Sequence, residues 1–289
     1  MGQSCVDIAG LRIGDKYPVR VMGVINLSLE SFYKGSVAVE EEGIRQIITR
    51  FENEGADIID IGGASTAPRD IYDTQKVSVR EELKRITSAI DIITSMTKLP
   101  LSVDTVSSKV AEKALDMGVV VINDVSGLKA DSKMAKLASD RTAPIILMAN
   151  CQPYCDSVQS SLESLRQSLS IAFEAGIGTS MILIDPGIGF GKPPNMDYEI
   201  LHNLCAFTVF NQPILVGVSR KAFIGSLLNQ LDPADRLSGS IAATSVAVYN
   251  GANIIRTHDV KETRIAVRIG EEIRKSAKKS QGTQTGDSQ

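Results

Sequence analysis

The sequence has no tryptophan, and aromatic residues make up only 4% of its 289 positions. A core with so few rings has to be built from aliphatic and β-branched side chains, which suits buried parallel strands. No apolar run is long enough to cross a bilayer, so we expect no membrane partner. The formal net charge is only −3 and no basic block occurs before the C-terminus, so we expect no nucleic-acid partner either.

Cysteine and histidine are also scarce, with four and two copies respectively. The cysteines do not form two paired clusters, which argues against a structural zinc site. Cys151 and Cys155 lie in a short polar segment, and we expect them to be incidental thiols with no metal or redox role. Thiols in a chain that starts without a signal peptide predict a cytoplasmic protein.

The sequence does contain a repeated order of strand and helix. Eight short β-branched runs each end in a polar or glycine-containing cluster, and stretches with helical apolar spacing, such as 40–54 and 77–97, lie between them. This order predicts an α/β fold, a single (β/α)8 TIM barrel with eight parallel strands, in preference to an open doubly wound sheet. We expect one domain over 1–279 and a disordered tail over 280–289. The eight runs span residues 19–26, 57–62, 99–104, 119–123, 144–148, 181–185, 213–218 and 252–256.

Polar residues follow nearly every predicted strand, at the end of the barrel where such folds carry their chemistry. One wall of this mouth is predicted to be rich in carboxylates and amides, and the adjacent wall in positive charge. A mouth divided in this way suits a substrate with a polar heterocycle at one end and phosphates at the other. The first wall would comprise Asp104, Asn123 and Asp185, and the second Ser219, Arg220, Lys221, Arg256 and His258.

Each of these residues taken singly also has a structural interpretation. Asp104 could cap the helix that starts near Ser107, and Asp185 could stabilise its own Asp-Pro-Gly turn. Asn123 could be a turn residue and Lys221 a surface lysine. The glycine-rich segment 187–192 is not a P-loop, because it lacks the Gly-Lys-Ser/Thr ending.

The strand ends lie in seven distinctive segments: VMGVINLSLESF, GADIIDIGGASTAP, LPLSVDT, GVVVINDVSG, ILIDPGIGFGK, ILVGVSRKAFIG and RLSGSIAATSVAVYNGANIIRTHD. From about Val21 to Asp259 these segments resemble, in order, the motifs of the dihydropteroate synthase family. The resemblance implies a transferase of the folate or methanopterin type of pathway. Such an enzyme joins 6-hydroxymethyl-7,8-dihydropterin pyrophosphate to 4-aminobenzoate, or a related arylamine, and releases 7,8-dihydropteroate and pyrophosphate.

The resemblance also implies a role for each matching residue, and Asp104, Asp185, Lys221 and Arg256 are the residues we expect to be catalytic. The pterin ring would be held by Asp104, Asn123, Asp185 and Lys221. Pyrophosphate would be bound by Asn26, Arg256 and His258, with Asn26 near a Mg2+ ion and Thr66 beside the phosphates. Ser219 and Arg220 would lie by the aminobenzoate pocket, and Gly217 would be a further substrate-binding residue.

Three departures from the family pattern lie in loops around the second substrate. Lys34 reverses a charge in the first loop, Ala67 stands where an arginine is usual, and the fifth strand ends in Ala149-Asn150. A ribosylated aminobenzoate derivative is therefore an alternative for the amine substrate. The alternatives are a pterin-dependent methyltransferase, a Schiff-base aldolase that uses Lys221, and a non-catalytic pterin-binding protein. We expect a homodimer that acts on small-molecule substrates.

Overall fold

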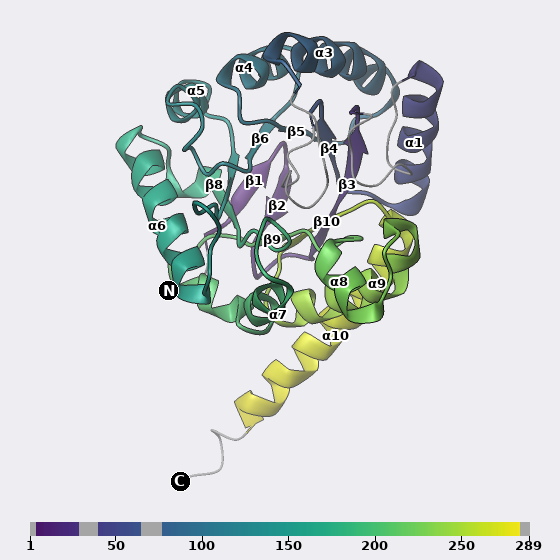
Figure 1. Cartoon of the computed structure of the whole chain (residues 1–289), viewed down its shortest axis with the longest axis vertical. Coiled ribbons are helices and arrows are strands. Elements are labelled where there is room, and N and C mark those ends of the chain that lie inside the picture. Colours follow the sequence, from purple (N-terminus) through teal and green to yellow (C-terminus); the bar gives the residue numbers. More distant parts are fainter. Residues whose placement is uncertain (1–3, 29–39, 65–76, 284–289) are drawn as a thin grey trace.

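The computed structural model describes residues 4–28, 40–64 and 77–283, and there it shows a barrel of parallel strands with helices around it (Figure 1). All eight predicted strands are present, which confirms the predicted TIM barrel. Their order is β8-β7-β6-β5-β4-β3-β10-β9, and a parallel bridge between Ile184 and Ile214 joins the two ends of the sheet. The strands are β3 (Arg20–Asn26), β4 (Ile58–Gly62), β5 (Leu101–Asp104), β6 (Val121–Asp124), β7 (Ile145–Met148), β8 (Ile182–Asp185), β9 (Leu215–Val216) and β10 (Ile254–Thr257).

The strand register brings the polar strand ends to one rim. Asn26 lies opposite Gly62, Gly62 lies opposite Asp104, and Asp104 lies opposite Asn123. Parallel neighbours run in the same direction, so residues that end consecutive strands become neighbours in space. The predicted gathering of polar groups at the barrel mouth is therefore a direct result of the pairing.

The helices alternate with the strands and cover the outside of the barrel (Figure 1). The spacing of Ile44, Ile48 and Phe51 places all three on the buried face of α1. The Phe51 ring packs so closely on β3 that a Cβ at Gly23 would lie 2.6 Å from it. The helices are α1 (Glu41–Glu54), α3 (Val79–Met96), α4 (Ser108–Asp116), α5 (Met134–Asp140), α6 (Val158–Glu174), α7 (Pro194–His202), α8 (Ala222–Leu228), α9 (Leu237–Tyr249) and α10 (Val260–Thr283), with 3-10 helices η2 (Thr179–Met181), η3 (Leu204–Phe210) and η4 (Pro233–Arg236).

A two-stranded antiparallel hairpin, β1 (Val6–Ile8) and β2 (Leu11–Ile13), precedes the barrel and was not predicted from the sequence. Its buried side chains pack against Ile58, Val121 and Ile254, each near the first residue of its barrel strand. The hairpin therefore covers the amino-terminal end of the barrel with apolar side chains. This leaves the opposite, carboxyl end as the one where polar groups gather.

Cys151 and Cys155 form a disulfide, with Cα atoms 5.0 Å apart, in the loop between β7 and α6. The prediction that they are incidental thiols is therefore wrong. Spacing along the chain argued only against a paired zinc site, and it did not reveal that this loop turns back on itself. Cys5 and Cys205 are free thiols on the surface.

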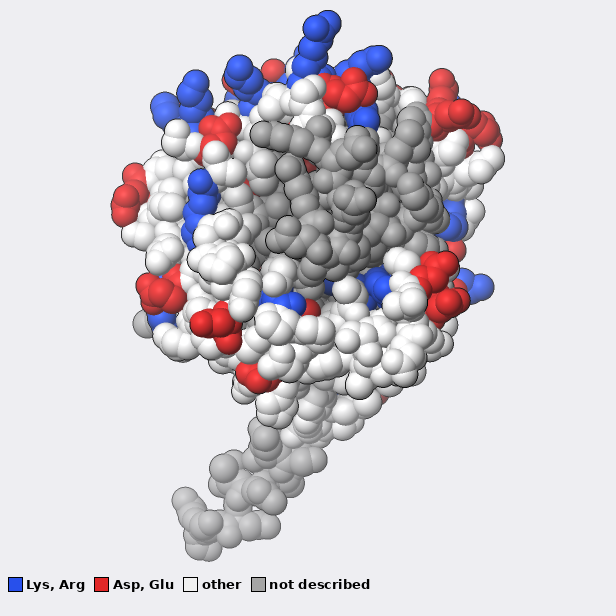
Figure 2. All heavy atoms as spheres, viewed as in Figure 1, with Lys and Arg blue, Asp and Glu red and all other residues white. Residues whose placement is uncertain are grey.

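Helix α10 continues beyond the barrel and ends at Thr283, so it includes residues 280–283 of the predicted tail (Figure 1). No helix among the described residues is long and apolar enough to cross a membrane. Figure 2 shows Lys and Arg side chains interspersed with Asp and Glu around the rim of the visible face.

Candidate functional site

Arg256, at the end of β10, lies at the floor of the barrel mouth between two carboxylates. Its Nε donates to Asp60 Oδ2 at 2.7 Å and its Nη2 donates to Asp104 Oδ2 at 2.8 Å. Asn123 Nδ2 also donates to Asp60 Oδ2, at 3.1 Å. The three strands β4, β5 and β6 and the last strand β10 are thereby connected through one charged cluster across the barrel.

Asp185 ends β8 and is buried on the same side of the mouth. Its Oδ1 accepts a hydrogen bond from Gly187 N at 2.7 Å, so the turn interpretation made from the sequence is correct as a local contact. Burial raises the pKa of the Asp185 carboxyl, and the positive charge of Lys221 opposes that rise. The second carboxylate oxygen is not needed for the turn, so Asp185 can serve both the loop and a ligand.

Lys221 reaches across to the loop that follows β8. Its Nζ donates to the carbonyl oxygen of Ile188 and lies 4.6 Å from the centroid of the Phe190 ring. Burial lowers its pKa to about 8, although Asp185 favours the charged form. Lys221 is therefore a cation at neutral pH that loses its proton more readily than a surface lysine.

Side-chain hydrogen bonds hold the loop after β8, and Gly189 in this loop allows the close approach of Lys221. Gly189 has a φ of +76°, and a Cβ there would lie 2.4 Å from Lys221 Cδ. The Gly189 N–H donates to Asp197 Oδ1 at 2.7 Å, and Lys192 Nζ donates to the Gly187 carbonyl. The glycine-rich segment thus forms a wall against which the lysine side chain packs.

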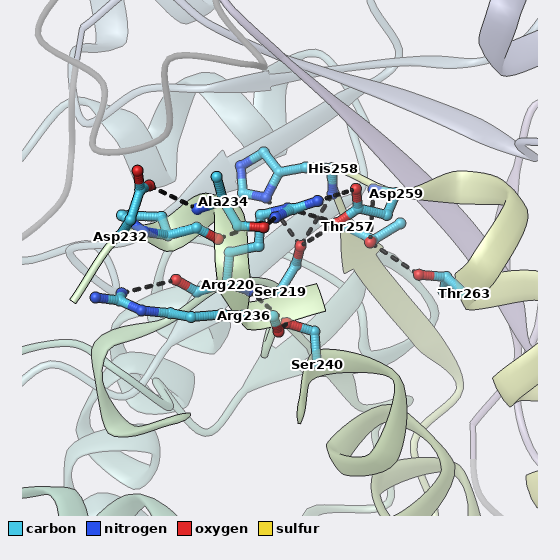
Figure 3. A network of polar contacts seen from close by, with 11 residues as sticks. Ser219, Arg220, Asp232, Ala234, Arg236, Ser240, Thr257, His258, Asp259 and Thr263 are labelled. Carbon is cyan, nitrogen blue, oxygen red and sulfur yellow. Dashed lines mark hydrogen bonds and ion pairs between the residues drawn. The ribbon is translucent and has the colours of Figure 1, made fainter. Parts of the chain in front are cut away.

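His258 and Ser219 form a second polar group beside this wall. Ser219 Oγ lies 2.9 Å from His258 Nδ1 and also accepts the His258 backbone N–H at 3.3 Å (Figure 3). Burial, together with the charges of Arg256, Arg220 and Lys221, lowers the pKa of His258 to about 3. His258 is therefore neutral at pH 7 and has several cations around it, which is a favourable environment for an anion.

Most of the predicted site residues come together at this mouth. Asp104, Asn123 and Asp185 lie on one side, and Lys221, Arg256, Ser219 and His258 lie against them. Gly217 leaves space between two of the cations, since a Cβ there would be 3.7 Å from both Lys221 Nζ and Arg256 Cβ. Arg220 points its guanidinium to protein acceptors instead. Thr66, Lys34 and Ala67 lie outside the described residues.

Sequence reasoning missed three buried polar groups near the site: Asp60, Lys192 and Asp197. Asp60 lies inside β4 and is fully buried. The signal in the sequence that could have identified it was an aspartate between two isoleucines of a predicted strand. Its Oδ1 has no hydrogen-bond partner among the described residues. Lys192 and Asp197 follow the glycine-rich segment, and no local pattern distinguishes them from surface charges.

Comparison with known proteins agrees with the resemblance seen in the sequence. Residues 22–258 match the family described as pterin binding enzyme. The dihydropteroate synthase of Bacillus subtilis is 37% identical over 244 residues, which are 84% of this chain and 84% of that protein. The dihydropteroate synthase of Coxiella burnetii, solved with pteroic acid, has a TM-score of 0.84 and 35% identity, covering 94% of this chain and 99% of that chain. The Xanthomonas albilineans dihydropteroate synthase, solved with 4-aminobenzoic acid, has a TM-score of 0.84 and 34% identity, covering 94% and 98%.

Proposed function

Because the chain belongs to the dihydropteroate synthase family of pterin-binding enzymes, we propose that it joins 6-hydroxymethyl-7,8-dihydropterin pyrophosphate to 4-aminobenzoate. The products are 7,8-dihydropteroate and pyrophosphate. The observation that carries the proposal is the placement of Asp185 and Lys221 together at the barrel mouth, next to the cluster of Arg256 with Asp104. Relatives that were solved with pteroic acid and with 4-aminobenzoic acid support both halves of the reaction.

The pterin ring would lie on the wall of carboxylates and amides. A pterin presents N–H donors on one edge and a carbonyl and ring nitrogens as acceptors on another. The Asp185 carboxylate and the Asn123 side-chain oxygen would accept from the N–H donors, and Lys221 Nζ would donate to the acceptors. Lys221 would exchange its bond to Ile188 for this contact, which costs little because one charge-assisted hydrogen bond replaces another.

The diphosphate would lie toward Ser219, His258 and Arg256. When the C–O bond breaks, positive charge develops on the pterin methylene and negative charge on pyrophosphate. Asp104 and Asp185 would stabilise the first charge and Arg256 the second. The amine then attacks the methylene carbon and its nitrogen loses one proton to solvent or to the departing pyrophosphate. An arylamine is neutral at pH 7, so no Ser-His-Asp relay is required.

A Mg2+ ion would be held beside the phosphates by Asn26. The Asn26 side-chain oxygen lies 3.6 Å from where a Cβ of Gly62 would be, so this glycine leaves space next to it. The described residues contain no cluster of three or more His, Cys, Asp or Glu placed to hold a metal. One amide oxygen suits Mg2+ that takes its remaining ligands from phosphates and water, and the ion would neutralise charge on pyrophosphate.

We also propose a homodimer through the outer face of α7, α8 and α9, and a cytoplasmic location. This face forms an apolar groove, and Leu227, Leu228 and Val246 in its lining are 64%, 45% and 45% exposed. Exposed apolar area of this kind favours association. Sedimentation of the wild type and of Leu227→Glu tests the dimer, which the variant should weaken.

The cytoplasmic location needs a separate test, which is fractionation of cells, because the disulfide removes one argument for it.

The activity is tested by pyrophosphate release with the pterin pyrophosphate, Mg2+ and either 4-aminobenzoate or its ribosylated derivative. We expect release that depends on 4-aminobenzoate, with formation of dihydropteroate. His258→Gln should lower the rate, because His258 lies on the side of the mouth proposed for the diphosphate. Higher turnover with the ribosylated amine would change the assigned substrate. Pterin binding without release would favour the non-catalytic alternative.

A further inference from the structure

The turn that carries Lys221 has a backbone conformation that needs outside support. Lys221 N donates to Val218 O at 3.4 Å, so residues 218–221 form a tight turn. Arg220 lies in the left-handed region of this turn, with a φ of +56°. Glycine is favoured at such a position, because a side chain there raises the free energy of the conformation. Contacts elsewhere must compensate for placing an arginine in it.

The Arg220 side chain supplies part of that compensation and does so away from the barrel mouth. Its Nη2 and Nε donate to the two carboxylate oxygens of Asp259, at 2.8 and 2.9 Å, in a bidentate ion pair (Figure 3). Its Nη1 donates to the carbonyl oxygens of Pro233 and Ala234 at 2.9 and 2.6 Å. Both partners of the ion pair are largely buried, with side chains 6% and 14% exposed. Such a pair holds the guanidinium in one orientation.

Arg236, at the end of η4, supports the backbone of the same turn. Its Nη1 donates to the Arg220 carbonyl at 3.1 Å, and its other nitrogens donate to the carbonyls of Gln230 and Leu231. Ser240 Oγ accepts from Arg220 N at 2.8 Å and donates to the Arg236 carbonyl at 2.7 Å (Figure 3). The backbone of Arg220 is therefore held at both its N–H and its carbonyl oxygen.

We propose that Arg236 and Asp259 are positioning residues for the synthase reaction, because together they set the turn that aims Lys221 at the pterin. The Arg220 carbonyl belongs to the peptide bond that leads into Lys221, so a contact there controls where the lysine side chain begins. Neither residue needs to touch substrate for this effect. The proposal rests on the proposed function, because it takes the pterin as the ligand of Lys221.

The test is a double-mutant cycle on pterin affinity. The ligand is 6-hydroxymethyl-7,8-dihydropterin, which has the ring and no phosphate, and binding is followed by its fluorescence. The variants are Arg236→Lys, Lys221→Met and the double variant. Lysine keeps the charge but lacks the planar fork whose three separate nitrogens reach the carbonyls of Arg220, Gln230 and Leu231. We expect Arg236→Lys to weaken binding about tenfold in the wild-type background and less than about twofold when Lys221 is already methionine.

Arg264 provides a matched control at the other end of the barrel. It donates to Asp57 and to the Gly55 carbonyl, so Arg264→Lys breaks contacts of the same kind far from the mouth. Urea denaturation of each variant gives its stability separately. Arg264→Lys should lose stability without losing pterin affinity. If Arg236→Lys does not fold, Asp259→Asn replaces it in the same cycle, because it removes the charge that holds Arg220.

The outcomes separate the two proposals. Equal loss of affinity from Arg236→Lys in both backgrounds, or no loss in either, would overturn the positioning role while leaving the synthase proposal intact. A wild-type protein that does not bind the pterin at all would overturn the synthase proposal and the positioning role with it. A loss of pterin affinity from Arg236→Lys that disappears in the Lys221→Met background supports both proposals.

Discussion

Lys221 gives the sharpest prediction, because pH should change pterin affinity and protein stability in opposite directions. The pKa of Lys221 is about 8 in the folded protein, against 10.5 for an ordinary lysine. If the ammonium group must be charged to hold the pterin, affinity is nearly constant below pH 7. It should then fall by roughly fivefold between pH 8 and pH 9.

The same pKa affects stability with the opposite sign. Between about pH 8 and 10.5 the unfolded chain binds more protons at this lysine than the folded chain does, so the free energy of unfolding rises with pH in that window. The full shift corresponds to about 3 kcal/mol. Lys221 is partly exposed at the mouth, where water screens the effect, so we expect roughly half of it to be measured.

The assay compares the wild type with Lys221→Met. Pterin fluorescence titrations from pH 6.5 to pH 9.5 measure affinity, and urea denaturation from pH 7 to pH 10.5 measures unfolding. The difference in unfolding free energy between the two proteins isolates Lys221 from other lysines. Lys221→Arg, whose charge does not titrate in this range, controls for ionisation of the pterin. A wild-type affinity that stays flat to pH 9.5, or a stability difference that does not change with pH, would refute the reasoning.

Three further predictions concern single contacts. Asp185→Asn should weaken pterin binding by about 10- to 100-fold in the same titration, because a charged acceptor is lost, and an unchanged affinity would contradict its role. Replacing Cys151 and Cys155 with serine should lower the free energy of unfolding by about 2 kcal/mol in urea, since the disulfide closes a short loop; equal stability of the two proteins would count against the disulfide. Gly23→Ala should cost about 1–3 kcal/mol in urea denaturation, because its Cβ would meet the Phe51 ring at 2.6 Å. A neutral result would show that the ring can move.

The strands and the polar rim were predictable from the sequence because both depend on local patterns. A buried parallel strand is a short β-branched run, and the eight runs predicted eight strands within a few residues of their observed bounds. The chain then determines which residues end each strand. Asp104, Asn123 and Asp185 could therefore be placed at the mouth before their partners were known. The hairpin over 6–13 was missed because two strands of three residues each leave little periodic signal.

The tertiary structure alone decided what each rim residue contacts. Arg256 pairs with Asp60, 196 positions away along the chain, and Lys221 reaches Ile188 across the mouth. Such contacts depend on side-chain direction and on strand register around a closed barrel, and no local pattern encodes either. For the same reason Arg220 could be placed at the mouth by sequence, whereas its orientation toward Asp259 appears only when α9 and β10 are packed beside it.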